Sequence, residues 1–89
     1  DEFVILLLNI HSKADAILVG EKIRRTLNEP FMIEGHTLHI SSCLGVALYP
    51  EHGRTTTELA KHADTAMYQA KDSGRDKVMV FDPAMAGGH

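Results

Sequence analysis

Lys71 and Arg75 are the most suggestive pair of cationic side chains in the chain, because they lie four residues apart where a predicted helix ends. Four residues is about one helical turn, so both side chains can lean over the same point. Lysine brings a point charge and arginine a planar fork that matches phosphate oxygens, so the pair can bind a phosphate group. Alternatively, the two cations only complement the dipole of the helix C-terminus, which is a sufficient account of either residue alone.

Two acidic residues, Asp1 and Glu2, stand directly before an apolar run. Residue type alone favours a solvated pair at the end of a strand. Carboxylates are also the hard oxygen ligands that Mg²⁺ prefers, often one or two of them together with phosphate oxygens. The two residues by themselves leave both interpretations open.

Other reactive side chains give weaker indications. Cys43 lies in the middle of a predicted strand and is expected to be a small buried hydrophobe, not a nucleophile. As the only cysteine it can form no intrachain disulfide, which fits a reducing compartment. Asp64 is expected to have a structural role, and Met67 and Tyr68 are expected to pack. The six histidines lack the spacing of a zinc site.

The composition sets broad limits on function. A chain of 89 residues makes one small domain with a thin stability margin. Its net charge of −3 argues against a general binder of nucleic acid or anionic membranes, although nine Lys and Arg can still form a local anion site. The apolar run is far too short to span a bilayer, so we expect no membrane contact from this segment. We expect a cytoplasmic location, in a parent protein that other domains could anchor to a membrane.

The elements that would position these side chains begin with a strand over residues 3–10, where a continuous apolar run favours burial on both faces. Ser12 is a predicted N-cap with Asp15 in the first turn, and the helix that follows should end near Asn28, before Pro30. Arg24 is among the positions on this helix that we expect to be solvated.

A short segment over 31–35 ends in a turn candidate, Glu34-Gly35, and evenly spaced apolar residues then predict one long strand over 37–49. Thr55 and Glu58 fit a capping box that starts a second helix, which Ser73-Gly74 should end. A last strand is predicted over 77–81, and residues 84–89 are predicted to be a flexible tail. The order predicts an α/β (α+β sandwich) fold with helices packed on one sheet.

Several stretches in this order resemble the GGDEF family of diguanylate cyclases, across nearly the whole chain. Asp1-Glu2-Phe3 is similar to the end of the family's signature motif, and residues 42–47 (Ser-Cys-Leu-Gly-Val-Ala) resemble its Ser-x-Gly-Val-Ala strand. Residues 49–53 match the loop that follows. The most distinctive match is residues 63–71 (Ala-Asp-Thr-Ala-Met-Tyr-Gln-Ala-Lys), followed by Gly74-Arg75-Asp76.

The resemblance implies a nucleotidyl cyclase-like fold with a ferredoxin-like sheet, of which residues 1–83 would form the C-terminal portion. It also implies a reaction that condenses two GTP molecules into cyclic di-GMP with release of pyrophosphate, in a homodimer. Asp1 and Glu2 would be catalytic and would hold Mg²⁺, or Mn²⁺ in its place. Lys71 and Arg75 would bind the phosphates of GTP.

The departures from the family pattern are at the start of the chain. The two motif glycines and the N-terminal half of the domain, with its other metal-binding Asp, do not precede Asp1 here. In the family, the first strand of that half lies between the strands predicted at 3–10 and 37–49. We therefore expect these two strands either to pair anew or to associate between chains, and we expect the chain alone to be inactive. Two alternatives stay open: a degenerate domain that binds GTP or cyclic di-GMP as a regulator, and a structural dimerisation module.

Overall fold

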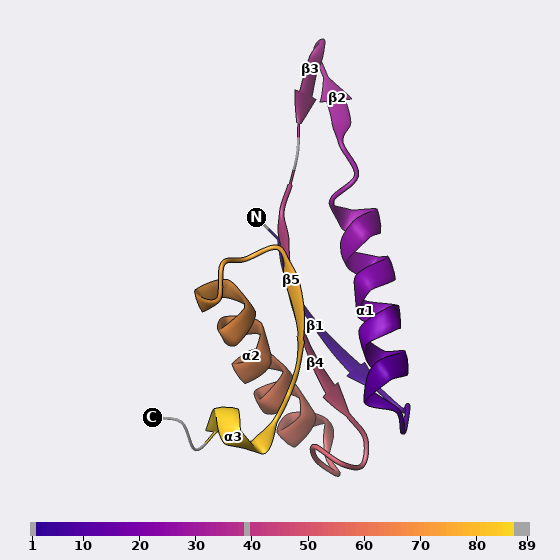
Figure 1. Cartoon of the computed structure of the whole chain (residues 1–89), viewed down its shortest axis with the longest axis vertical. Coiled ribbons are helices and arrows are strands. Elements are labelled where there is room, and N and C mark those ends of the chain that lie inside the picture. The colour runs from indigo at the N-terminus through magenta and orange to yellow at the C-terminus, as the bar shows by residue number, and fades with distance from the viewer. Residues whose placement is uncertain (1, 39, 87–89) are drawn as a thin grey trace.

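The computed structural model describes residues 2–38 and 40–86, and it has parallel strands between two long helices (Figure 1). Asp1 therefore lies outside the described residues. The elements are β1 (Glu2–Leu8), α1 (Lys13–Leu27), β2 (Phe31–Ile33), β3 (His36–Leu38), β4 (Ser42–Leu48), α2 (Thr56–Asp72), β5 (Lys77–Val80) and α3 (Pro83–Ala86). The predicted α/β class is confirmed. No helix in the described part of the chain is both long and apolar enough to cross a bilayer.

The main sheet has the order β1-β4-β5, with both pairs parallel. All seven residues of β4 are buried, because the strand lies between two neighbours and under a helix on each face. Val46 and Leu48 face α1 and pack in one cluster with Ala16, whereas Ala47 packs on the other face with Leu59 and Ala63 of α2. This double coverage explains why the strand has no charged residue and is apolar from Cys43 to Leu48.

The strands β1 and β4 pair directly with each other, from Glu2 opposite Ser42 to Leu8 opposite Leu48. The backbone N–H of Tyr49 donates to the carbonyl of Leu8 at 2.8 Å, which continues the ladder past the strand end. Of the two outcomes expected for these strands, the structure shows new pairing within the chain.

The prediction of one long strand over 37–49 is wrong. Its first part, β3, pairs with β2 in a separate antiparallel hairpin that stands away from the sheet (Figure 1), and β4 begins only at Ser42. Glu34 and Gly35 both have positive φ, 51° and 81°, as a type I′ hairpin turn requires. The apolar spacing keeps the period of a strand throughout, but it carries no information about which strand each part pairs with.

Single hydrogen bonds confirm the predicted N-caps of α1 and α2. Ser12 Oγ accepts from the N–H of Asp15 at 3.2 Å, and Thr55 Oγ1 accepts from the N–H of Glu58 at 3.1 Å. The second half of the capping box differs, because the Glu58 carboxylate accepts from the N–H of Arg54 and from the Thr55 hydroxyl, both at 3.3 Å.

The C-terminal part differs from the predicted tail, since Pro83–Ala86 form the single turn α3. Asp82 starts this turn: its carboxylate accepts from the N–H of Ala84 at 2.9 Å, and its carbonyl accepts from the N–H of Met85 at 2.8 Å. Residues 87–89 lie outside the described residues.

Gly45 allows α2 to pack directly on β4. A Cβ at this position would stand 2.0 Å from the carbonyl oxygen of Ala63 and 2.4 Å from the backbone nitrogen of Met67. Both obstacles are backbone atoms, so no side-chain rotation would relieve the contact. The glycine of the Ser-x-Gly-Val-Ala match thus sets how closely α2 approaches the sheet, and with it the position of Lys71 one turn further along the helix.

Candidate functional site

Three of the four predicted site residues lie at one end of the sheet. Glu2 begins β1, Lys71 is in the last turn of α2, and Arg75 is in the turn between α2 and β5. Because the three strands are parallel, their first residues meet at the same end, with Glu2 opposite Ser42 and Lys77 opposite Cys43. The fourth residue, Asp1, precedes Glu2 but lies outside the described residues, so its predicted role stays a prediction.

The Lys71 ammonium lies over two aromatic rings. Its Nζ is 5.7 Å from the centre of the Phe3 ring and 5.9 Å from the centre of the Tyr68 ring, both within the range of a cation–π contact. The side chain of Lys71 is half-buried. The structure therefore places this cation beside Phe3, which is 68 residues away in the sequence.

Arg75 is held in an unusual backbone conformation. Gly74, Arg75 and Asp76 follow one another with φ values of 116°, 64° and 49°. The N–H of Arg75 donates to the carbonyl of Ala70 at 3.0 Å, and the N–H of Gly74 donates to the carbonyl of Lys71 at 3.4 Å, which is the Schellman arrangement at a helix C-terminus. Two successive non-glycine residues in the left-handed region are costly, at about 1–2 kcal/mol each, so other contacts must hold the turn.

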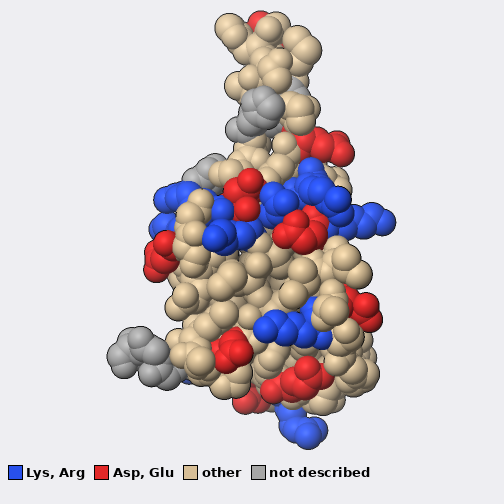
Figure 2. All heavy atoms as spheres, viewed as in Figure 1, with Lys and Arg blue, Asp and Glu red and all other residues tan. Residues whose placement is uncertain are grey.

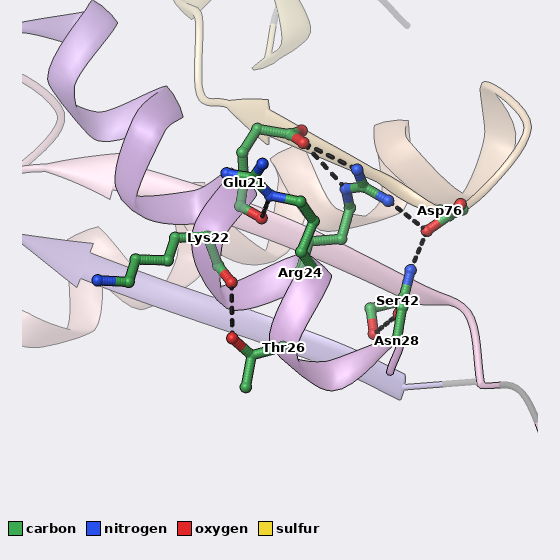
Figure 3. Close-up of polar contacts among 8 residues, drawn as sticks. Glu21, Lys22, Arg24, Thr26, Asn28, Ser42 and Asp76 are labelled. Atoms are coloured by element: carbon green, nitrogen blue, oxygen red, sulfur yellow. Dashed lines mark hydrogen bonds and ion pairs between the residues drawn. The ribbon is translucent and has the colours of Figure 1, made fainter. Parts of the chain in front are cut away.

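A polar network on Asp76 supplies such contacts (Figure 3). Arg24 donates to the Asp76 carboxylate at 2.7 Å and to the Glu21 carboxylate at 2.8 Å. The Asn28 amide also donates to Asp76, and its carbonyl oxygen accepts from the hydroxyl of the buried Ser42 at 2.7 Å. The network thus ties the end of α1 to the Arg75 turn and to the first residue of β4.

The network corrects the prediction that Arg24 is a solvated position. Its side chain is only 19% exposed, and its hydrogen bonds to Glu21 and Asp76 raise the pKa of the guanidinium above its usual value. Arg24 and Asp76 are 52 residues apart, and no local spacing in the sequence signals such a pair. Sequence reasoning missed Arg24, Asn28 and Ser42 for this reason.

Lys and Arg side chains gather at this end of the molecule, with Asp and Glu side chains among them. Figure 2 shows them in a band across the body, next to the protruding hairpin. Arg24 and Arg25 in the last turn of α1, and Lys71 in the last turn of α2, belong to this end of the fold. A local anion site is therefore compatible with the net charge of −3.

The hollows of the surface do not coincide with the predicted site residues. A hollow of about 470 Å³ lies along α2 and α3, and another of about 460 Å³ lies around residues 50–54. A smaller one of about 200 Å³, lined by Asn28, Ile40, Ser41 and Asp76, adjoins the polar network. Glu2, Lys71 and Arg75 line none of these three hollows.

The remaining sequence-based assignments have mixed outcomes. Cys43 is buried, 1% exposed, as predicted. Tyr68, which was expected to pack, is 53% exposed, and its ring contacts the Lys71 ammonium at the helix surface. Among the described residues, no three His, Cys, Asp or Glu side chains are grouped closely enough to hold a metal ion. Glu2 is the described member of the proposed acidic pair.

Comparison with a protein-family model gives a match over most of the chain. The family model described as "Diguanylate cyclase, GGDEF domain" matches residues 1–77. The chain is 44% identical over 85 residues to the bifunctional diguanylate cyclase/cyclic di-GMP phosphodiesterase MucR of Pseudomonas aeruginosa, and 41% identical over 85 residues to the cyclic di-GMP phosphodiesterase PdeR of Escherichia coli. It covers 12% and 13% of these two relatives, so it spans only a small part of their length, while 96% of this chain is aligned in each case.

Solved structures of the same domain match the fold. The GGDEF domain of TpbB (YfiN) from Pseudomonas aeruginosa superposes with a TM-score of 0.78 at 33% identity, covering 88% of this chain and 46% of that one. An EAL/GGDEF domain protein from M. capsulatus gives a TM-score of 0.72 at 36% identity, covering 82% of this chain and 47% of that one. The match over residues 1–77, together with this likeness of fold, shows that the chain belongs to the GGDEF family of diguanylate cyclase domains.

Proposed function

We propose that this chain is the C-terminal portion of a diguanylate cyclase catalytic domain, which condenses two GTP molecules into cyclic di-GMP. The observation that supports this most directly is the Lys71 ammonium over the Phe3 ring, 5.7 Å from its centre. It joins a phosphate-binding cation to the segment that carries the two acidic residues. Arg75 lies in the same end of the fold, four residues beyond Lys71.

In this proposal, Lys71 and Arg75 bind the GTP phosphates. Lys71 contributes a point charge whose Nζ already contacts the Phe3 and Tyr68 rings, so it loses less side-chain freedom on binding than a fully exposed lysine would. Arg75 contributes a planar fork on a turn that the Schellman bonds hold in place. Arg24 and Asn28 do not contact the nucleotide in this scheme; through Asp76 they keep the Arg75 turn in its left-handed conformation.

The acidic pair Asp1 and Glu2 would hold a divalent cation, Mg²⁺ or Mn²⁺. Glu2 is exposed at the end of the sheet, and a second carboxylate adjoins it in the sequence. One or two carboxylates, completed by phosphate oxygens and water, are a usual protein donor set for Mg²⁺. When bound, the cation would neutralise charge that develops on the attacked α-phosphate. Asp1 would also accept the proton of the attacking ribose hydroxyl.

We expect the 89-residue chain to bind nucleotide weakly and to be inactive alone. It covers 46% of the solved GGDEF domain of TpbB, so about half of such a domain is not represented in it. The reaction joins two GTP molecules, and we propose that two complete domains meet in a homodimer to bring them together. Use of GTP favours a cytoplasmic location for the domain.

A regulatory role is the second candidate. PdeR, 41% identical to this chain, is named a cyclic di-GMP phosphodiesterase and not a cyclase. A GGDEF domain in such a protein could bind GTP and control a neighbouring domain without forming product. The presence of Glu2, Lys71 and Arg75 together at one end of the fold favours the catalytic proposal.

The phosphate-binding part of the proposal is tested by calorimetric titration of the chain with GTP and Mg²⁺. The double substitution Lys71→Ala with Arg75→Ala should weaken binding by at least about a hundredfold, because it removes two hydrogen-bonding cations and each such bond contributes about 1.5–3 kcal/mol. Lys61→Ala is the matched control, because Lys61 is on the same helix, ten residues before Lys71. If the double variant and Lys61→Ala bound GTP with the same dissociation constant, Lys71 and Arg75 would only complement the helix dipole.

The catalytic part is tested with a chimera in which this chain replaces the corresponding portion of the TpbB GGDEF domain. Mass spectrometry should detect cyclic di-GMP from GTP and Mg²⁺, and Asp1→Ala should abolish it without loss of the fold. A folded chimera that binds GTP but forms no product would favour the regulatory role. Retained turnover in Asp1→Ala would remove that residue from the catalytic role.

A further inference from the structure

Asn28 ends α1 at a point where three segments of the fold meet (Figure 3). Its backbone N–H donates to the carbonyl of Arg24 at 2.9 Å, so the helix end fixes where its side chain starts. The amide group of that side chain donates to the Asp76 carboxylate, and its carbonyl oxygen accepts from the Ser42 hydroxyl at 2.7 Å. One side chain of α1 therefore contacts both the turn that carries Arg75 and the first residue of β4.

The two partners of Asn28 fix the orientation of its amide group. A carboxylate can only accept hydrogen bonds, so the amide nitrogen has to face Asp76. The carbonyl oxygen then faces Ser42, whose hydroxyl donates to it. Ser42 is fully buried, and a buried hydroxyl that lacks a partner is costly. The start of β4 thus holds the amide in the one orientation in which it can donate to Asp76.

Asp76 passes this constraint on to the turn. It is the third successive residue with positive φ, after Gly74 and Arg75, and its own φ is 49°. Backbone of this kind persists only where surrounding contacts hold it. Arg24 and Asn28, one helical turn apart on α1, both donate to the same oxygen of Asp76, Oδ1.

The strand that carries Glu2 meets the same network from the other side. Glu2 lies opposite Ser42 in the parallel register of β1 and β4, and its backbone N–H donates to the carbonyl of Ser41 at 2.8 Å. A continuous series of contacts therefore runs from β1 through the start of β4 and the end of α1 to the turn after α2. It joins the segment of the proposed acidic residues to the segment of the proposed phosphate-binding arginine.

We propose that Asn28 is a positioning residue that holds the Arg75 turn in register with the strand that carries Glu2. The inference rests on the proposed function, because it concerns how the acidic and the phosphate-binding parts of that site are set relative to each other. Asn28 itself contacts neither nucleotide nor metal ion in this scheme. Its loss should displace the Arg75 fork from the phosphates and leave the Lys71 ammonium over its two aromatic rings.

Calorimetric titration of the 89-residue chain with inorganic triphosphate and Mg²⁺ tests the proposal, since this probe needs no contact to guanine. Asn28→Ala should weaken binding by about tenfold, the scale of one lost hydrogen bond to a charged group. In a chain with Arg75→Ala the same change should alter the dissociation constant by less than about twofold, whereas in a chain with Lys71→Ala it should keep its full effect. Thr26→Ala is the matched control, because the Thr26 hydroxyl donates to the Lys22 carbonyl in the same part of α1. Equal effects of Asn28→Ala in the two backgrounds would overturn the proposal.

Ser42→Ala separates positioning from stability. Asn28→Ala takes the acceptor away from the buried Ser42 hydroxyl and should destabilise the fold, and the added Ser42→Ala removes that hydroxyl and should recover part of the loss in urea unfolding. The affinity for triphosphate should stay low in this double variant, because Asp76 still lacks the Asn28 donor. Recovery of affinity together with stability would mean that Asn28 acts only through the fold, which would also overturn the proposal.

Amide hydrogen exchange tests the position of the turn without any ligand. The N–H of Arg75 donates to the carbonyl of Ala70 at 3.0 Å. In the double variant Asn28→Ala, Ser42→Ala it should exchange about tenfold faster relative to the N–H of Phe81, which bonds within the sheet. An unchanged ratio of the two rates would contradict the positioning role. If this ratio rose but the wild-type chain bound no triphosphate, the phosphate-binding role under the proposed function would fail, and the positioning of the turn by Asn28 would stand.

Discussion

Replacement of Gly45 by alanine should cost more stability than the same replacement at any other glycine that the structure describes. The new Cβ would lie 2.0 Å from the Ala63 carbonyl oxygen, and ordinary van der Waals contact begins at 3.4 Å, so α2 would have to retreat by about 1.4 Å. That retreat would loosen Ala63 and Leu59, which pack on Ala47 of β4. Overpacking of a well-packed core costs about 1–3 kcal/mol. Because the obstacle is backbone, we expect a loss of about 3 kcal/mol or more.

This loss would be large for so small a chain. At about 0.05–0.15 kcal/mol per residue, an 89-residue domain has a free energy of unfolding of about 4–13 kcal/mol. A loss of about 3 kcal/mol should lower the midpoint of thermal unfolding by about 12–24 °C, at about 4–8 °C per kcal/mol for a domain of this size. Urea unfolding followed by circular dichroism at 222 nm, the usual helix signal, measures the change directly.

Gly35→Ala is the matched control for Gly45→Ala. It adds the same methyl group, but a Cβ at Gly35 would meet no atom within 4 Å. Its cost comes only from the positive φ of 81°, and should be about 1 kcal/mol. If Gly45→Ala were no more destabilising than Gly35→Ala, α2 would not rest on β4 at this point and the packing described above would be wrong.

Three further substitutions test other parts of the fold. Gly20→Ala should be destabilising despite the better helix propensity of alanine, because the new Cβ would lie 2.6 Å from Val78 Cγ1. In a protein that already carries Val78→Ala, the same Gly20→Ala change should be neutral or stabilising. A double-mutant cycle measured by urea unfolding would show this. Thr55→Ala should cost about 1 kcal/mol by the same measurement, since it removes the N-cap of α2; an unchanged midpoint would contradict the cap. Burial lowers the pKa of His52 below its usual 6.5, and its Nδ1 accepts from the N–H of Leu48, so the folded state favours the neutral ring. The stability that the neutral His52 ring contributes to the folded state should be fully present above about pH 6.5, and it should be lost as the pH falls towards the folded-state pKa. His52→Asn should therefore flatten the fall in stability as the pH drops below about 6.5, measured by urea unfolding at a series of pH values; an equal fall in both proteins would contradict this assignment.

Much of the fold could be predicted because its signals are local. The N-caps at Ser12 and Thr55 and the helix stop at Gly74 each depend on bonds that close within a few residues, so residue type and spacing reveal them. The apolar run of β1 and the family motifs are equally short. The phosphate-binding role of Lys71 and Arg75 stays a prediction, and Arg75 lies in the turn after α2 and not on the helix itself.

Contacts between distant segments could not be predicted in the same way. The apolar spacing over 37–49 fits a strand throughout, yet β3 pairs with β2 and β4 pairs with β1 and β5. Periodicity reports which face of a strand is buried, but it does not identify the neighbouring strand. The split into two sheets appeared only in the structure.

The same division holds for the candidate site. Residue type and family resemblance were enough to propose Glu2, Lys71 and Arg75. The contacts that bring Lys71 to Phe3 and tie Arg24 to Asp76 exist because α1 and α2 pack on opposite faces of one parallel sheet and both end where its strands begin. That arrangement depends on the summed burial of many apolar side chains across both faces. No single stretch of the sequence reports this total burial, so only the folded structure shows that these residues lie close together.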